Sequence, residues 1–307
     1  MNALSYRPVR ASRSEFVTVR GLRHHLMHWG DASMASAERP PLLMLHGWMD
    51  VGASFQFVVD ALAHDRHVIA PDWRGFGLTD TPHTDTYWHP DYLGDLDGLL
   101  DALQTSHPAA ARVDLLGHSM GANVAMLYAG LRPERLRRLV NLEGFGLPAT
   151  QPSQAPDRFL TWLDELKQPA QLRGYDSVQA VAARLQKTNP LLRTDRAEWL
   201  AAHWSRRDAS GVWQILGDPV HKRSHPALYQ KDEAMACWQR IQAPVLWVEG
   251  DRSEIGKLWG TRYSKEEFHQ RVSVVRHVEK HVLSPAGHML HHDQPEALAL
   301  LLEKFLA

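Results

Sequence analysis

The stretch LLGHSMGANVAMLYAG, residues 115–130, decides the fold of this chain. An apolar run leads into Gly117-His118-Ser119-Met120-Gly121, which fits the pattern G-x-S-x-G, and helical spacing follows. Glycines flank the serine because a turn from strand to helix is too tight for side chains at those places. Such a corner lifts the serine hydroxyl off the end of a sheet, beside the positive N-terminus of the helix. The stretch therefore predicts a nucleophilic serine, Ser119, at a strand-to-helix turn.

Strand and helix patterns alternate along the chain on both sides of this corner. Continuous apolar runs suit strands that are buried on both faces of a parallel sheet. Strands are expected at residues 15–21, 22–30, 40–48, 66–77, 112–119, 135–146, 243–251 and 280–288. Helical spacing occupies residues 54–63, 91–103, 121–130 and 295–306. We therefore predict an α/β protein with a mostly parallel, eight-stranded sheet and helices on both of its faces.

The alternation stops between residues 147 and 238, where helical segments occur without a buried strand. These helical segments are residues 157–166, 177–187 and 196–204. The simplest organisation is a single α/β core with a helical insertion after its sixth strand. We assign residues 1–146 and 239–307 to the core and residues 147–238 to a helical cap.

Composition places the chain among ordinary globular proteins, with 44% hydrophobic and 22% charged residues in 307. A formal net charge of −1 argues against a nucleic acid or an anionic membrane held mainly by charge. The single cysteine, Cys237, excludes an internal disulfide. The first 15 residues lack the apolar core of a signal peptide, and no apolar run reaches the roughly 18 residues of a membrane span. We expect a soluble, cytoplasmic protein with no nucleic-acid or membrane partner.

A serine hydroxyl needs a base, and His288 is the candidate among 19 histidines. His288 lies in SPAGHMLHHDQPEALA, a glycine-bearing loop between the last strand and the last helix, and it follows the serine in chain order. His291 and His292 lie nearby and belong to the approach to that helix. Three close histidines could suggest zinc, but no Cys, Asp or Glu in the sequence completes a recognisable ligand pattern. We expect no metal.

An oxyanion formed by attack of the serine needs backbone donors. One donor should be the N–H of Met120, directly after the serine. The second should come from the loop LHGWMD, and we expect it to be the N–H of Trp48. His46 and Gly47 let that loop turn sharply and approach the serine. We expect His46, Gly47 and His118 to border the substrate, with His46 mainly shaping the loop.

Four segments carry a resemblance to a known superfamily: LHGW (45–48), APDWRGFGLTD (70–80), LLGHSMGA (115–122) and AGHMLHHDQPE (286–296). In their order and approximate spacing they resemble the α/β hydrolases. LHGWMDVGASF (45–55) and GHSMGANVAMLYAGLRPERL (117–136) are similar to the serine-hydrolase-like and epoxide-hydrolase-like branches. The resemblance covers nearly the whole chain outside the insertion. It implies the α/β-hydrolase fold, and it says less about activity, because that fold hosts many chemistries.

A catalytic triad also needs an acid to orient the histidine. In most members of the superfamily it is an Asp three residues past a glycine, after the seventh strand; here Gly250-Asp251-Arg252-Ser253-Glu254 puts Ser253 there. The stretch LVNLEGFGLP (139–148) resembles that of haloalkane dehalogenases, whose members include some with the acid at the end of the sixth strand. The acid that we expect is therefore Glu143, with Asp251 and Glu254 as alternatives.

The nucleophile favours acyl transfer over displacement at carbon, because the dehalogenases and epoxide hydrolases of this superfamily attack with aspartate. Aromatic side chains of the cap, Trp162 and Trp213 among them, are expected to contact an apolar group of the substrate. We predict a serine hydrolase, without cofactor, that cleaves small to medium apolar carboxylic esters, as a monomer or homodimer. The alternatives are a carbon–carbon bond hydrolase of diketone-like substrates and a ligand-binding protein with a slow or inactive site.

Overall fold

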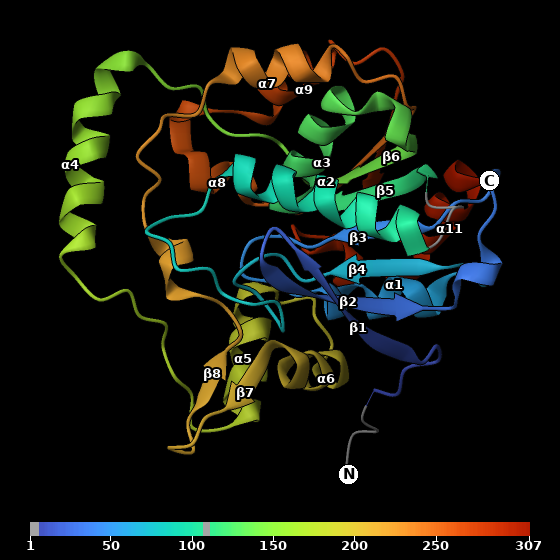
Figure 1. Cartoon of the computed structure of the whole chain (residues 1–307), viewed down its shortest axis with the longest axis horizontal. Coiled ribbons are helices and arrows are strands. Elements are labelled where there is room, and N and C mark those ends of the chain that lie inside the picture. Colours follow the sequence, from blue (N-terminus) through green and yellow to red (C-terminus); the bar gives the residue numbers. More distant parts are fainter. Residues whose placement is uncertain (1–5, 107–110) are drawn as a thin grey trace.

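The centre of the molecule is an eight-stranded sheet in the order β1-β2-β4-β3-β5-β6-β9-β10 (Figure 1). The computed structural model describes residues 6–106 and 111–307, so part of the N-terminal stretch considered for a signal peptide lies outside it. β1 and β2 run antiparallel to their neighbours, and the other six strands are parallel. The strands are β1 (Ser12–Val19), β2 (Leu22–Trp29), β3 (Leu42–Leu45), β4 (Val68–Pro71), β5 (Val113–His118), β6 (Leu136–Leu142), β9 (Val245–Gly250) and β10 (Val278–Leu283). The mostly parallel, eight-stranded sheet predicted from the sequence is confirmed.

The register of the parallel strands gathers distant loops around one point. Leu45 at the end of β3 pairs with Gly117 of β5, and His118 at the end of β5 pairs with Leu142 at the end of β6. Leu142 in turn pairs with Val248 of β9. Because these strands run in the same direction, the loops that follow β3, β5, β6 and β9 leave the sheet at the same edge, where α/β proteins bind ligands.

Helices cover both faces of the sheet, and a separate apolar cluster fills each side. On one side, helices α2, α3, α7 and α9 pack their apolar side chains onto the sheet together with Trp259. On the other side, α1, α10 and α11 do the same. The helices outside the insertion are α1 (Gln56–Ala61), α2 (His89–Ser106), α3 (Met120–Leu131), α8 (Ile255–Trp259), α9 (Lys265–Val272), α10 (Leu290–Asp293) and α11 (Pro295–Leu306). Short 3-10 turns lie at Ala32–Met34, Gly52–Phe55, Pro133–Arg135, Pro152–Gln154, Pro219–Lys222 and Gly260–Arg262.

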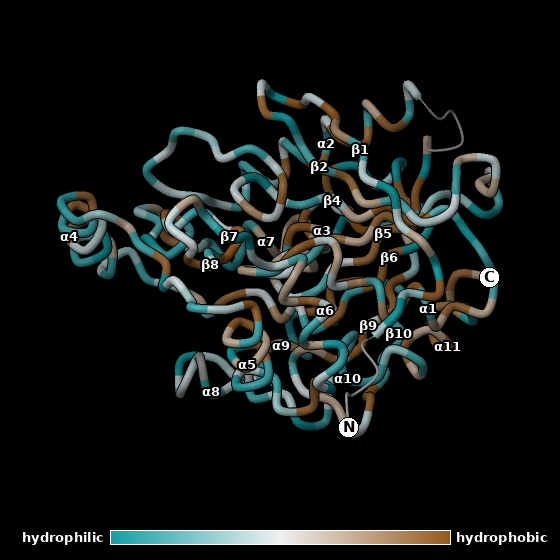
Figure 2. The backbone as a smooth tube through the Cα atoms, turned by 90° about the horizontal axis from the view of Figure 1, so that it is seen from below, coloured by the Kyte–Doolittle hydropathy of each residue, from teal (hydrophilic) through white to brown (hydrophobic). Residues whose placement is uncertain are grey.

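The insertion between β6 and β9 contains the three expected helices. They are α4 (Ala155–Leu166), α5 (Val178–Thr188) and α6 (Thr194–Trp204). α5 and α6 pack against each other in a small apolar cluster that also takes in Phe57 of α1. α4 buries none of its residues and lies at the edge of the molecule in two views (Figures 1 and 2). The α5–α6 pair therefore forms a third, smaller apolar cluster, which rests on α1 through Phe57.

Two features of the insertion differ from a purely helical cap. β7 (Ser205–Arg207) and β8 (Trp213–Ile215) form a two-stranded antiparallel hairpin after α6. α7 (Lys231–Trp238) packs against α3, so closely that a Cβ on Gly130 would lie 1.9 Å from the carbonyl oxygen of Cys237. The predicted cap range thus includes a helix that packs on the core. None of the helices among the described residues has the length and apolar character needed to cross a membrane.

Candidate active site

Ser119 occupies a strained corner between β5 and α3. Its φ is 51°, a left-handed conformation that is rare outside glycine. The flanking glycines are required by space, because a Cβ on Gly117 would lie 2.5 Å from the backbone of Ala122. One on Gly121 would lie 2.3 Å from the carbonyl oxygen of Leu45. The tight packing of both glycines fixes the corner and leaves the Ser119 side chain half-buried at the edge of the sheet.

His288 bridges Ser119 and Glu143. The Nε2 atom of His288 lies 3.0 Å from Ser119 Oγ, and its Nδ1 atom lies 3.0 Å from Glu143 Oε2. A carboxylate only accepts hydrogen bonds, so Nδ1–H donates to Glu143 and Nε2 is left to accept from the serine hydroxyl. This is the tautomer that a general base beside a serine needs.

Glu143 is held in place as a buried acceptor. It is 1% exposed, and its backbone has a φ of 57°, a left-handed conformation that is rare outside glycine. Its Oε1 accepts a hydrogen bond from the N–H of Gly250 at 2.8 Å, and its Oε2 also accepts one from Ser253 Oγ. These donors compensate a buried carboxylate that would otherwise be costly.

The two alternative carboxylates point elsewhere. Asp251 accepts hydrogen bonds from the N–H of Ala286 at 2.9 Å and from Ser284 Oγ at 2.7 Å. Glu254 forms an exposed ion pair with Lys257. Of the three candidate acids, the structure brings Glu143 alone to His288.

The two residues expected to supply the oxyanion donors, Met120 and Trp48, line the same cavity as Ser119. Met120 is the first residue of α3, so its N–H has no acceptor within the helix. Trp48 lies in the loop after β3, next to Gly47, where a Cβ would be 3.3 Å from the Cβ of Ser119. A Cβ on Gly47 would also lie 2.9 Å from Nδ1 of His118, which explains why the loop carries a glycine where it passes Ser119.

His46 does not line the substrate space, contrary to the expectation that it borders the substrate. It is fully buried, and burial lowers its pKa below the ordinary histidine value. Its Nε2 accepts from the N–H of Trp73 at 2.9 Å, and its carbonyl oxygen accepts from the Trp73 indole at 2.9 Å. His46 therefore ties the loop after β3 to the loop after β4.

His118 lies behind His288. Its Nε2–H donates a 2.9 Å hydrogen bond to the carbonyl oxygen of His288. Burial, followed by the neighbouring His291 and His288, lowers the pKa of His118 well below its usual range. A neutral His118 that donates to this carbonyl fixes the backbone of His288, although part of His118 also borders the smaller of two cavities.

Two cavities meet at Ser119, and both reach Trp48 and His288. The larger has a volume of about 470 Å³, and the smaller has a volume of about 250 Å³. Aromatic side chains dominate the wall of the larger cavity: Trp48, Tyr87, Trp88, Tyr92, Phe145 and Trp259, with His89 and His221. The smaller cavity is lined by Gly47, Met49, Leu185, Leu192, Leu200 and Trp204, with Arg184, Thr188 and Asn189 among its polar residues. Mainly apolar cavities of these sizes suit small organic groups.

The two predicted cap tryptophans line neither cavity. Trp162 lies on α4, at the edge of the molecule, and Trp213 packs in the small cluster of α5 and α6. Their place is taken by aromatic residues of the loop before α2 and by Trp204. Sequence reasoning missed Tyr87, Trp88 and their neighbours because a loop without periodicity gives no signal about the direction of its side chains.

His221 closes the aromatic cavity from the insertion side. Its ring is stacked between Phe76 and Tyr87, with centroids 3.7 Å from each. Its Nε2–H donates to the carbonyl oxygen of Arg74 at 3.2 Å, and its Nδ1 accepts from the hydroxyl of Tyr92 at 3.3 Å. Burial lowers the pKa of His221 to about 3, so the ring is neutral at physiological pH.

Comparisons with known proteins identify the fold family of this chain. The sequence model for the alpha/beta hydrolase fold matches residues 40–295. A serine hydrolase-like protein of Danio rerio is 30% identical over 283 residues, covering 87% of this chain and 81% of that protein. One from Dictyostelium discoideum is 24% identical over 284 residues, covering 86% and 74%. Among solved structures, the thioesterase domain from the curacin biosynthetic pathway has a TM-score of 0.80 and 26% identity, covering 96% of this chain and 99% of that one. This chain belongs to the α/β-hydrolase fold family.

Proposed function

We propose that the protein is a serine hydrolase that cleaves small to medium apolar carboxylic esters through an acyl-enzyme on Ser119. One observation carries this proposal. An unbroken chain of hydrogen bonds runs from Ser119 Oγ through His288 to Glu143, at the point where two apolar cavities meet. Glu143 is the acid of the proposed triad.

The reaction takes two steps. Ser119 Oγ attacks the ester carbonyl carbon while His288 Nε2 takes the hydroxyl proton, and Glu143 stabilises the resulting imidazolium. The N–H groups of Met120 and Trp48 receive the oxyanion of the tetrahedral intermediate. Its collapse breaks the bond to the alcohol oxygen, which takes the proton from His288. Water then attacks the acyl-enzyme with the same proton transfers, releasing the acid and restoring Ser119.

The walls of the cavities support the substrate class. An ester bond at Ser119 has an acyl group on one side and an alcohol group on the other, and each side finds one cavity. Aromatic side chains line one cavity and aliphatic side chains line much of the other, so apolar groups gain from burial on both sides. Similarity to serine hydrolase-like proteins and to a thioesterase domain supports acyl transfer.

The test is hydrolysis of p-nitrophenyl esters from acetate to decanoate by the wild type and by Ser119→Ala. The wild type is expected to turn over part of the series, and the variant to lose about 10⁴-fold or more of kcat. Incubation with a fluorophosphonate, followed by mass spectrometry, should give an adduct on Ser119 that Ser119→Ala lacks. Turnover that survives in Ser119→Ala would contradict the acyl-enzyme. An inert wild type would contradict esterase activity and make diketone-like carbon–carbon substrates the next to test.

A further inference from the structure

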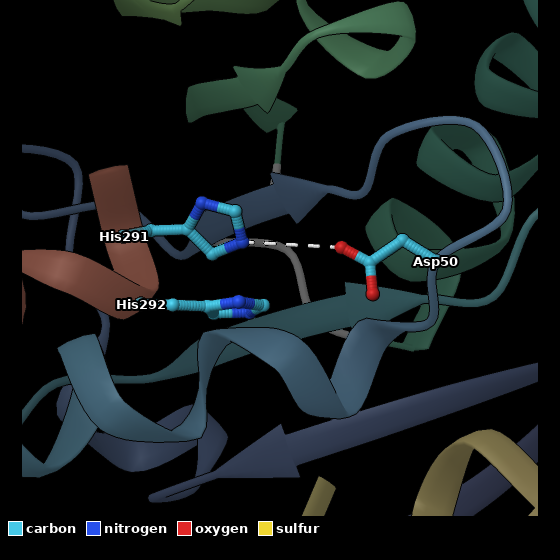
Figure 3. Close-up of side chains that lie close together, drawn as sticks. All are labelled: Asp50, His291 and His292. Atoms are coloured by element: carbon cyan, nitrogen blue, oxygen red, sulfur yellow. Dashed lines mark ion pairs between the residues drawn. The ribbon is translucent and has the colours of Figure 1, made fainter. Parts of the chain in front are cut away.

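Next to the proposed catalytic centre, three buried side chains converge from distant parts of the sequence. Asp50 comes from the loop after β3, and His291 and His292 come from α10 (Figure 3). Figure 3 shows both imidazole rings directed toward the Asp50 carboxylate. One ligand atom of each residue lies within 4.8 Å of the other two, and His291 Nε2 is 3.9 Å from Asp50 Oδ2. All three side chains are at most 4% exposed.

The polar atoms that face this space lack close hydrogen bonds. Within residues 6–106 and 111–307, Asp50 Oδ2 and the ring nitrogens of His291 and His292 have no hydrogen bond of 3.5 Å or less, and the approach of His291 Nε2 to Asp50 Oδ2 is 3.9 Å. The other oxygen of Asp50 is saturated, because it accepts from the N–H of Val51, from Ser54 Oγ and from the Trp204 indole. The carboxylate is therefore fixed with Oδ2 turned toward the histidines. Buried polar groups are normally satisfied by short hydrogen bonds, so a cluster held together only by long contacts has room for a ligand between its polar atoms.

Two imidazoles and a carboxylate are ligands typical of zinc and related divalent transition ions. Their bonds to zinc are about 2.0–2.2 Å long, which puts tetrahedral ligand atoms about 3.3 Å apart. Ligand atoms that now lie up to 4.8 Å apart reach that spacing if their separations shrink by up to about 1.5 Å, a change that rotation of two facing side chains can share. Asp50 and His292 also line the smaller cavity, so an ion has an entry path and a fourth coordination position. We propose that Asp50, His291 and His292 form a binding site for one divalent transition-metal ion.

The site is separate from the proposed triad but lies close to it. The ring centroids of His118 and His291 lie 4.3 Å apart with the rings tilted, and His118 Nε2–H donates to the carbonyl oxygen of His288. Any histidine can bind a metal ion. A binding experiment therefore has to distinguish the proposed site from His288 in the proposed triad. The histidine cluster was visible in the sequence, but Asp50 was not recognised as its partner because it comes from a loop far along the chain from the two histidines.

Binding of Zn²⁺ and Co²⁺ to the purified, metal-free full-length chain tests the proposal. Calorimetry should find one Zn²⁺ per chain, with affinity reduced by about tenfold or more in Asp50→Asn and in His292→Gln. Two controls should keep wild-type affinity: His288→Gln in the proposed triad, and His281→Gln on exposed β10. Co²⁺ bound to the wild type should show the intense visible bands of a four-coordinate ion, a readout that needs neither a variant nor enzyme activity.

Three results would overturn the site. The first is wild-type protein that binds no Zn²⁺. The second is unchanged affinity in folded Asp50→Asn and His292→Gln. The third is loss of binding in His288→Gln or His281→Gln, which would move the ion to the triad or to the surface. If either ligand variant fails to fold, the spectrum of Co²⁺ bound to the wild type provides the test. Weak visible bands, typical of a six-coordinate ion, would contradict the proposed site.

Discussion

Ser253 Oγ donates a hydrogen bond to Oε2 of Glu143, the oxygen that also accepts from His288 Nδ1. Residues 143 and 253 therefore reach the same point from the ends of two neighbouring strands, β6 and β9. The serine stands where most members of the family would place an acid, and here it serves as a donor to an acid from the next strand. The side chain of residue 253 is therefore close to the carboxylate oxygen that contacts His288.

Replacement of Glu143 by Gln should lower kcat/KM for p-nitrophenyl esters by about 10³–10⁴-fold, with the protein still folded. Glutamine cannot stabilise the imidazolium of His288, and its amide group favours the wrong tautomer. The matched control is Asp251→Asn, which removes a carboxylate that points away from His288 and should change kcat/KM by only a few fold. Near-wild-type activity in Glu143→Gln would contradict the proposed role of Glu143.

Moving the acid to the other strand should restore activity. The double variant Glu143→Gln/Ser253→Asp is expected to recover about tenfold or more in kcat/KM over Glu143→Gln, because a carboxylate at 253 can reach Nδ1 of His288. The steady-state assay with the same esters measures it. Glu143→Gln/Ser253→Asn provides the control, since it has the same shape without the charge. Equal activity in the two double variants would show that residue 253 cannot supply the acid.

A bulky side chain at Thr188 should shorten the preferred ester. Thr188 lines the smaller cavity from α5, so Thr188→Trp narrows the space for one of the two groups of the substrate. We expect kcat/KM for long-chain esters to fall by about tenfold while that for acetate stays near wild type. The control is Lys187→Trp, which adds the same bulk at an exposed neighbouring position that lines neither cavity. An unchanged chain-length profile in Thr188→Trp would mean that the smaller cavity does not hold substrate.

The sequence predicted the core of the fold because long apolar runs carry a strong signal. The runs around Leu43, Leu115 and Val140 match strands that are buried on both faces of the sheet. The hairpin of β7 and β8 was missed, since strands of three residues show no periodicity. Its pairing is set by tertiary contacts, such as the bridge between Tyr175 and Trp213.

In the candidate site, too, some residues could be predicted from local sequence and others depend on tertiary packing. Ser119, Glu143 and His288 could be singled out because each directly follows a strand or lies in a motif. The walls of the cavities could not, because they come from loops whose side-chain directions depend on packing. His221 is an example, since its position is set by stacking on Phe76 and Tyr87 rather than by anything in its own segment.

The lowered pKa of His221 predicts a loss of stability in mild acid. Its folded-state pKa, about 3, lies below the ordinary value of about 6.5, so only the unfolded chain takes up a proton between these values. The contribution of neutral His221 is complete above about pH 7 and is lost as the pH falls toward 3, by up to about 1.4 kcal/mol per pH unit.

His221→Gln isolates this contribution from that of the other buried histidines. Glutamine can still donate to the carbonyl oxygen of Arg74 and accept from Tyr92, but it does not titrate. The free energy of unfolding, measured with urea from pH 8 to pH 4.5, should fall less steeply in the variant than in the wild type below about pH 6.5. Above pH 7 the difference between the two proteins should be constant. Parallel curves throughout the range would refute the prediction.

Stability should depend strongly on Asp114, at the end of β5 that lies away from Ser119. Asp114 is fully buried and accepts hydrogen bonds from Arg66 at 2.8 Å and from Arg137 at 2.7 and 2.9 Å. Asp114→Asn leaves two arginines without their counter-charge, so urea unfolding should show a loss of about 3 kcal/mol, with kcat of the folded protein unchanged. Asp101→Asn removes an exposed ion pair with Arg135 and should cost less than about 1 kcal/mol. If the two variants lost the same free energy of unfolding, burial of Asp114 and its ion pairs with Arg66 and Arg137 would add nothing to stability.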